Sequence, residues 1–149
     1  MVDIQSRLEE TKCIFQEDNN RTRKMKKLRF ETEDSNHGLS TTRGFSWFSE
    51  DVLMFEYQVS DSIFEILKSE LKELTVPFAQ IETISFKNSW FSGGKILVEL
   101  GSLKNIDKTP FLEDAVLCLE IERKNKDTAK EFAVNANLAL ANFKFDQLG

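Results

Sequence analysis

The segment VLMFEYQV at residues 52–59 decides the fold class, because its apolar side chains recur at every second position. Leu53, Phe55, Tyr57 and Val59 alternate with Met, Glu and Gln. A period of two places four side chains on one face of a strand that is buried on one side only. Shorter segments of the same character lie on both sides of it, so the sequence predicts a mainly β protein.

The neighbouring segments predict further strands. They cover residues 28–31, 42–47, 63–67, 71–76, 81–86, 96–100 and 115–121. Residues 62–74 fit either two strands or one amphipathic helix, and two strands are favoured because strands flank the segment and an extended residue precedes Pro77. Between residues 86 and 96, Gly93 and Gly94 supply the positive φ that a hairpin turn needs.

One amphipathic helix is predicted after the last strand, over about residues 127–143, with Thr128 and Glu131 as a capping box. Its apolar face, spaced by three and four residues, consists of Ala129, Phe132, Ala133, Ala136, Leu140 and Phe143. Small residues in the middle of this face permit close approach to a sheet. The predicted architecture is a curved, partly open β-barrel of about seven strands capped by one C-terminal helix.

Length and composition indicate a single Phe-rich domain, since 149 residues with 13 Phe can bury one continuous core. We interpret residues 1–27 as a polar and basic leader, helical or disordered, and residues 28–149 as the domain. The leader lacks the apolar core of a signal peptide, and no segment is apolar enough to span a membrane. These features predict a cytoplasmic protein.

Basic residues concentrate at the end of the leader, in nine positions without an acidic residue. They are Arg21, Arg23, Lys24, Lys26, Lys27 and Arg29. This run either is solvated and pairs with the domain's own carboxylates, which is the usual case, or attracts an anionic membrane surface. The whole chain has a formal net charge of −5, which argues against a nucleic-acid partner because phosphate contacts need a basic face.

The sequence predicts no enzyme, no metal site and no cofactor. His37 is the only histidine and stands beside Gly38 in a predicted turn, which is typical of a surface loop. Cys13 and Cys118 lie far apart in sequence, so neither a disulfide framework nor a zinc site is expected. Cys118 is expected to pack as a small apolar side chain within a strand.

Two pairs of large aromatic residues are candidate contact sites. Trp90 and Phe91 stand at the tip of the Gly-Gly hairpin, and Trp47 and Phe48 precede a polar turn. Exposed rings would anchor a partner or a membrane interface, whereas buried rings would fold back over the mouth of the barrel. We favour burial for both pairs because large apolar side chains are mostly covered.

From about residue 28 to residue 143 the order of elements resembles that of small bacterial pleckstrin-homology-like (PH-like) domains. The resemblance is carried by TVPFAQIETI at residues 75–84, similar to the proline-containing link in that family, and by LCLEIER at 117–123 leading into the helix. It implies two near-orthogonal sheets and a role in lipid binding, peptide recognition or scaffolding. Lipid-binding members carry paired basic residues across the first hairpin, where this chain has Asn36, His37, Gly38 and Arg43.

Two functions are therefore expected. The leading one is a non-catalytic binding or assembly module that engages a protein partner, which can be a second copy of the chain. Open sheet edges and aromatic tips would supply the contacts. The alternative is peripheral association with an anionic membrane, with the basic run as the electrostatic contact and Trp90 and Phe91 as an apolar wedge.

Overall fold

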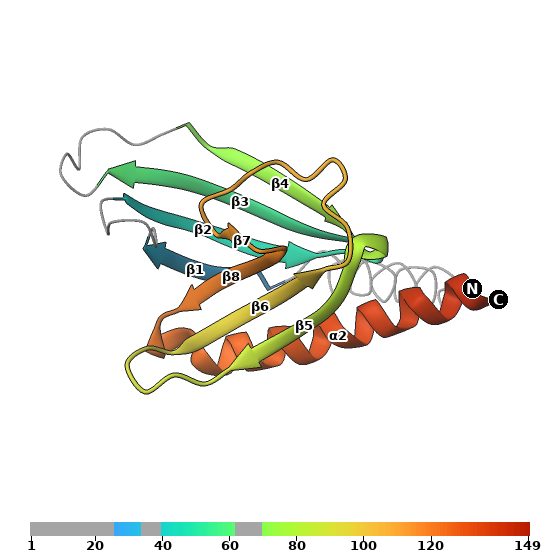
Figure 1. Cartoon of the computed structure of the whole chain (residues 1–149). Helices are drawn as coiled ribbons and strands as arrows, with labels where there is room; N and C mark the ends of the chain where they lie inside the picture. The colour runs from blue at the N-terminus through green and yellow to red at the C-terminus, as the bar shows by residue number, and fades with distance from the viewer. Residues whose placement is uncertain (1–25, 34–39, 62–69) are drawn as a thin grey trace, which may run out of the picture.

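Two antiparallel sheets and one long helix make up the protein, as a computed structural model of residues 26–33, 40–61 and 70–149 shows (Figure 1). In these residues the first sheet has the order β1-β2-β3-β4, with β1 (Leu28–Glu33), β2 (Ser40–Phe48), β3 (Val52–Asp61) and β4 (Lys72–Pro77). The second sheet has the order β5-β6-β8-β7, with β5 (Ile81–Lys87), β6 (Gly94–Leu100), β7 (Leu112–Glu113) and β8 (Val116–Ile121). Two short 3₁₀ turns, η1 (Phe78–Gln80) and η2 (Arg123–Asn125), precede β5 and the helix α2 (Lys126–Leu148) respectively.

The predicted fold class, a mainly β domain with a C-terminal helix, is confirmed. The described residues hold eight strands rather than about seven, because the two-residue β7 forms within a segment expected to be a loop. Ile81 departs from the alternation of its strand because the β5–β6 register shifts between Ile81 and Thr83. Ala115 has a φ of 61° and lies in the turn before β8 rather than in the strand.

The ambiguous segment at residues 62–74 is resolved in part. Its last three residues belong to β4, which pairs with β3 from Lys72 to Pro77, so a helix over the whole segment is wrong. The predicted strand at 63–67 lies outside the described residues. The same holds for most of the leader, for Cys13 and for His37.

The two sheets meet along the seam between β1 and β8 and are connected by the chain at η1. At the seam, the backbone N–H of Glu120 in β8 donates to the Thr32 hydroxyl of β1 over 3.2 Å. Backbone hydrogen bonds between β1 and β8 would close the two sheets into one barrel. Among the described strands the two sheets stay separate, and this side-chain bond lies at the seam instead. The result is the curved, partly open arrangement that the sequence predicts.

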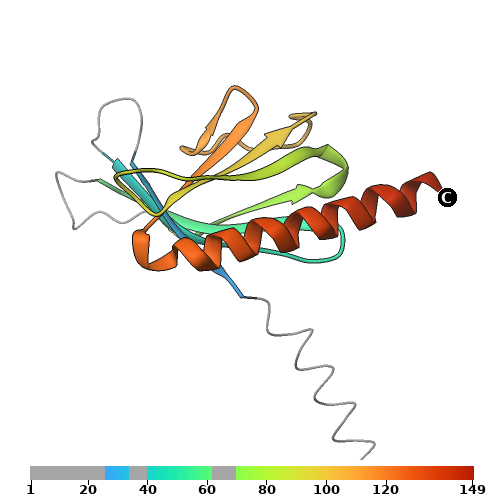
Figure 2. The same cartoon turned by 90° about the horizontal axis from the view of Figure 1, so that it is seen from below.

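Helix α2 covers the opening between the sheets and packs against β5 (Figure 2). The predicted buried face is confirmed, since Ala129, Phe132, Ala133, Ala136 and Leu140 are all buried. Phe132 meets the ring of Phe48 edge to face, and Phe143 does the same with Phe78. Small side chains along this face let the helix lie close to the strands. The helix is therefore held by β5, by the end of β2 and by η1.

The predicted capping box is wrong, although the helix begins within one residue of the predicted start. The helix begins at Lys126, after Asn125 as N-cap, so Thr128 lies within the first turn and does not cap it. The helix also ends five residues later than predicted, at Leu148. The spacing of buried apolar residues predicts only the part of a helix that packs against the core. The last residues of α2 extend past the sheets (Figures 1 and 2). The buried face therefore could not predict them.

The core centres on Phe111, which comes from the connection between β6 and β7 and is 3% exposed. Its ring lies 5.3 Å from that of Phe30, 5.5 Å from Phe55 and 5.1 Å from Tyr57, measured between ring centroids. All three partners belong to the first sheet, whereas the Phe111 carbonyl accepts a hydrogen bond from Cys118 in the second. Phe111 therefore holds the two sheets together.

Replacing Phe111 with Ala should lower the free energy of unfolding by about 3–5 kcal/mol, because a buried ring is lost and the rigid neighbours cannot fill the cavity. Phe111→Leu should cost less, since it retains more volume. Urea denaturation of the intact chain measures both. A Phe111→Ala variant as stable as the original would contradict the central position assigned to this ring.

Burial raises the pKa of Tyr57, with a smaller contribution from the negative charge of Asp107. The folded state therefore favours the neutral phenol. The resulting stability is fully present below about pH 10, the ordinary pKa of tyrosine, and is lost as the pH rises through the higher pKa of the folded state. Because Tyr57 is the only tyrosine, the absorbance of tyrosinate reports it alone.

We expect the tyrosinate titration of the folded chain to have a higher midpoint than that of the chain in denaturant. Asp107→Asn should lower the folded midpoint partway, because it removes the smaller cause and leaves burial unchanged. Equal midpoints in the folded and unfolded chain would show that Tyr57 is accessible to water.

Candidate functional site

The connection between β5 and β6 carries the most exposed aromatic pair of the described residues. Trp90 is 93% and Phe91 94% exposed. Our expectation that these rings fold back over the barrel is wrong. The loop extends away from the core at the end of β5, and no described element lies above it to cover the rings.

The backbone of this loop is nevertheless fixed. The guanidinium of Arg123, in η2, donates to the carbonyl of Trp90 over 3.0 Å, and the N–H of Gly93 donates to the carbonyl of Ile121 over 2.7 Å. A β-carbon on Gly93 would lie 2.2 Å from the carbonyl oxygen of Glu122, so only glycine permits this approach. Gly94 has the predicted positive φ, at 114°, whereas the positive φ predicted for Gly93 is wrong.

A hollow of about 310 Å³ lies beside the exposed rings and is lined by Asn88, Ser89, Trp90 and Lys126. Three of these residues come from the loop, and Lys126 is the first residue of α2. The hollow offers an amide, a hydroxyl and an ammonium group next to an indole ring. This combination can bind a group that has both an apolar body and a polar or negatively charged end.

Cations surround the base of the loop. Lys87 ends β5, and η2 contributes Arg123 and Lys124. Two lysines in this region form ion pairs. Lys95 lies 3.6 Å from Glu120 and Lys124 lies 3.3 Å from Glu122, measured between nitrogen and oxygen. Within the described residues Lys87 and Lys126 form no ion pair, so the surroundings of the rings are locally positive on an acidic chain.

Trp47 and Phe48 do not join this surface. Both are half-buried, so they are neither covered as expected nor fully exposed. Phe48 packs against Phe132, and the ammonium of Lys27 lies 4.4 Å from the centroid of the Trp47 ring. The β2–β3 turn next to them is bonded to η1 through the N–H of Phe78 and the carbonyl of Asp51, 2.8 Å apart. The length of β5 separates η1 from the β5–β6 connection that carries Trp90 and Phe91, which we call the Trp90 loop. The two aromatic pairs therefore lie at opposite ends of the domain.

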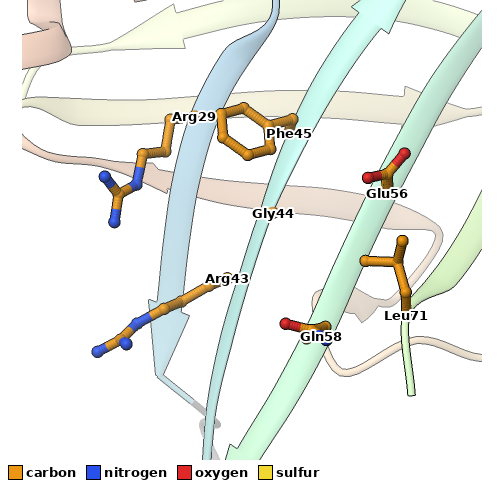
Figure 3. A pocket seen from close by; sticks show the side chains of 7 residues that line it. All are labelled: Arg29, Arg43, Gly44, Phe45, Glu56, Gln58 and Leu71. Atoms are coloured by element: carbon orange, nitrogen blue, oxygen red, sulfur yellow. The ribbon is translucent and has the colours of Figure 1, made fainter. Parts of the chain in front are cut away.

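The outer face of the first sheet carries a second, smaller hollow of about 210 Å³ (Figure 3). Its lining residues are Arg29, Arg43, Gly44, Phe45, Glu56, Gln58 and Leu71. Arg29 of β1 pairs with Phe45 of β2, and Phe45 pairs in turn with Glu56 of β3. The Arg43 guanidinium lies 3.3 Å from the Glu31 carboxylate, so one of the two arginines is already paired.

The basic run divides where the described chain begins. Arg21, Arg23 and Lys24 lie outside the described residues. Lys26 pairs with Glu131 of α2 over 3.5 Å, Lys27 lies over Trp47, and Arg29 borders the outer hollow. All three cations contact the domain itself. Lys27 and Arg29 lie on the first sheet, whereas Glu131, the partner of Lys26, stands five residues after Lys126 in α2. Lys27 and Arg29 therefore do not form one cationic surface with Trp90 and Phe91.

Cys118 is the one cysteine within the described residues, and it lies half-buried on β8. Burial raises the pKa of its thiol, Lys95 lowers it, and the carboxylates of Glu120 and Glu113 raise it further. A raised pKa keeps the thiol protonated at neutral pH and its nucleophilicity low. No group of histidine, cysteine and carboxylate side chains in the described part of the chain could hold a metal ion.

Two exposed features were not predicted from the sequence. Phe45 is 42% exposed on the outer face of β2, although alternation places residues 43, 45 and 47 together and could have indicated it. The second is an apolar stripe on α2, on the side away from the core, whose members also lie three and four residues apart. Asn135, Asn137 and Asn142 flank this stripe, and polar residues at these positions predict a side of the helix that faces solvent.

Comparison with protein-family models, with curated proteins and with solved structures gave no match. The resemblance to PH-like domains therefore stays a prediction. In the described residues no helix is long and apolar enough to span a membrane.

Proposed function

We propose that this chain is a non-catalytic binding module of PH-like fold that engages a protein partner through the β5–β6 loop. One observation carries the proposal: Trp90 and Phe91 are almost fully exposed on a loop whose backbone is held by Arg123 and Gly93. Large exposed rings are costly in water, and each releases about 1.5–3 kcal/mol when it is buried. A fixed backbone lowers the entropy lost on binding.

The chemistry of the loop fits a protein surface. Trp is enriched among the residues that dominate binding energy, and such residues lie in a ring of polar groups that excludes water. Here Asn88, Ser89 and Lys126 provide polar groups beside the indole. The partner we expect has an apolar pocket for the two rings and carboxylates near its rim, because Lys87, Arg123 and Lys126 stand around the base of the loop.

A second candidate function is peripheral association with an anionic membrane, favoured by the cations beside the exposed rings. Trp and Phe can enter the boundary between headgroups and acyl chains, while Lys and Arg attract anionic lipids. The basic run was expected to add to this contact, but Lys27 and Arg29 lie on the first sheet and Lys26 is paired with Glu131. The local positive charge is therefore small, and we place this function second.

The Trp90→Ala/Phe91→Ala variant tests the surface without disturbing the fold, because exposed side chains contribute little to stability. Leu103→Ala is the matched control, since Leu103 is 50% exposed and lies in the β6–β7 connection. We expect capture of a partner from an extract of the source cells by the original chain and by Leu103→Ala. Loss of each ring should weaken that binding about 30-fold, the equivalent of roughly 2 kcal/mol.

Capture that is identical for all three chains would place the binding surface elsewhere. Co-sedimentation with vesicles with and without phosphatidylserine, at low and high salt, separates the two functions. Binding to the anionic vesicles alone that weakens with salt and with loss of the rings would favour the membrane. If no vesicle binds and capture depends on the rings, the proposed protein partner is supported.

A further inference from the structure

Helix α2 has a second apolar stripe, on the side away from the sheets. Four of its members are large and exposed: Val134 at 67%, Leu138 at 60%, Phe145 at 76% and Leu148 at 86%. The fifth, Ala141, is exposed as well. On a helix with 3.6 residues per turn the stripe points roughly 140° away from the buried face. None of the described residues covers these side chains.

The spacing of the stripe is that of a coiled coil. Its positions, 134, 138, 141, 145 and 148, alternate steps of four and three residues over two heptads. Such a 3.5-residue repeat keeps apolar side chains facing a second helix along its whole length, here about 21 Å at 1.5 Å per residue. Solvent-facing positions of a helix that acts alone would instead be polar.

The stripe is also self-complementary. Val134 and Leu148 stand seven positions on either side of Ala141, and Leu138 and Phe145 stand three and four positions from it. When two copies cross antiparallel at Ala141, each large side chain therefore meets a large one. The small side chain at the centre permits the helices to approach within about 8–10 Å.

The flanking charges do not oppose this pairing. The residues next to the stripe are Asn135, Asn137, Asn142 and Lys144. In the antiparallel arrangement Asn142 would face its own copy. Asn137 and Lys144 instead donate to the carbonyls of Ile84 and Glu82 in β5 of their own chain. Like charges therefore do not meet along the contact. The C-terminal turns of α2 also project beyond the sheets, so a second helix can approach them without meeting the sheets (Figures 1 and 2).

We infer that the exposed stripe of α2 is a homodimer interface, occupied by the same helix of a second copy in antiparallel orientation. Four large exposed side chains provide on the order of 500 Å² per copy, since a single Phe contributes about 150 Å² or more. Two copies would bury about 1,000 Å², the lower limit for a specific interface. The dimer should therefore be weak, with a monomer–dimer ratio that depends on concentration. This inference concerns a surface separate from the Trp90 loop.

Sedimentation velocity of the full chain over a range of concentrations tests the interface. We expect the mass to rise from 17.2 kDa toward twice that value as the concentration increases. Leu138→Asp/Phe145→Asp should stay monomeric at every concentration while remaining folded by circular dichroism, because both side chains are exposed. Leu103→Asp, the same change at another exposed leucine, should dimerise like the original chain.

Disulfide trapping tests the orientation, in a chain from which Cys13 and Cys118 have been removed by Cys13→Ser and Cys118→Ala. Ala141→Cys should cross-link to itself across the two-fold axis. Val134→Cys should not, because antiparallel pairing places it opposite Leu148. Cross-linking of Val134→Cys alone, or of both variants equally, would overturn the antiparallel arrangement.

An intact chain that stays monomeric at all concentrations would overturn the inference. If a chain starting at Met25 then dimerises, the occupant of the stripe is the leader rather than a second copy. The Trp90→Ala/Phe91→Ala variant should dimerise normally, so failure of this interface and failure of the proposed partner site are distinguishable.

Discussion

The packing of Phe111 between the sheets is the constraint on which the rest of the structure depends. Among the described residues the two sheets share a backbone connection at η1 and one side-chain hydrogen bond at the β1–β8 seam. Most of their attachment therefore comes from apolar contact. Phe111 supplies the centre of that contact because it meets three rings of the first sheet while its carbonyl binds β8. Once β8 is placed, its end sets the position of η2, and with it that of Arg123.

The candidate binding loop therefore depends on the core, although it lies far from it. Arg123 and the carbonyls that end β8 hold the backbone of residues 90–93, and they do so without covering either ring. The same arrangement explains why the two rings can remain exposed and still be presented in one orientation. Local rather than net charge matters at this surface, since three cations stand beside the rings on a chain with a net charge of −5.

Helix α2 combines two apolar faces with different roles. One face, built around three alanines, lies against β5 and closes the opening between the sheets. The other carries larger side chains and points outward, and the helix continues past the point where Phe143 meets Phe78. The domain can thus attach to a second copy through its helix while the Trp90 loop stays accessible. Two separate contacts on one small domain suit an assembly module, because pairing two copies raises the effective concentration of their binding loops.

Local patterns in the sequence predicted most of the fold and little of the candidate site. Alternation in residues 52–59, the Gly93-Gly94 turn and the apolar face of the helix depend on neighbours within a few residues, and each predicted its element correctly. The prediction of a capping box failed because the spacing of Thr128 and Glu131 is the same when both residues lie inside the helix as when they cap it. The exposure of Trp90 and Phe91 could not be predicted, since residue type alone favours burial.

The sequence by itself determined the mainly β class, the hairpin and the amphipathic helix, because backbone conformation follows from local spacing and glycine. Only the tertiary structure decided which apolar side chains are covered. Phe111 and Phe91 are the same residue type, each in a connection between strands, yet one is 3% and the other 94% exposed. Hydrophobic attraction has no direction of its own. The long-range placement of β8, η2 and α2 therefore selects which rings enter the core and which remain available to a partner.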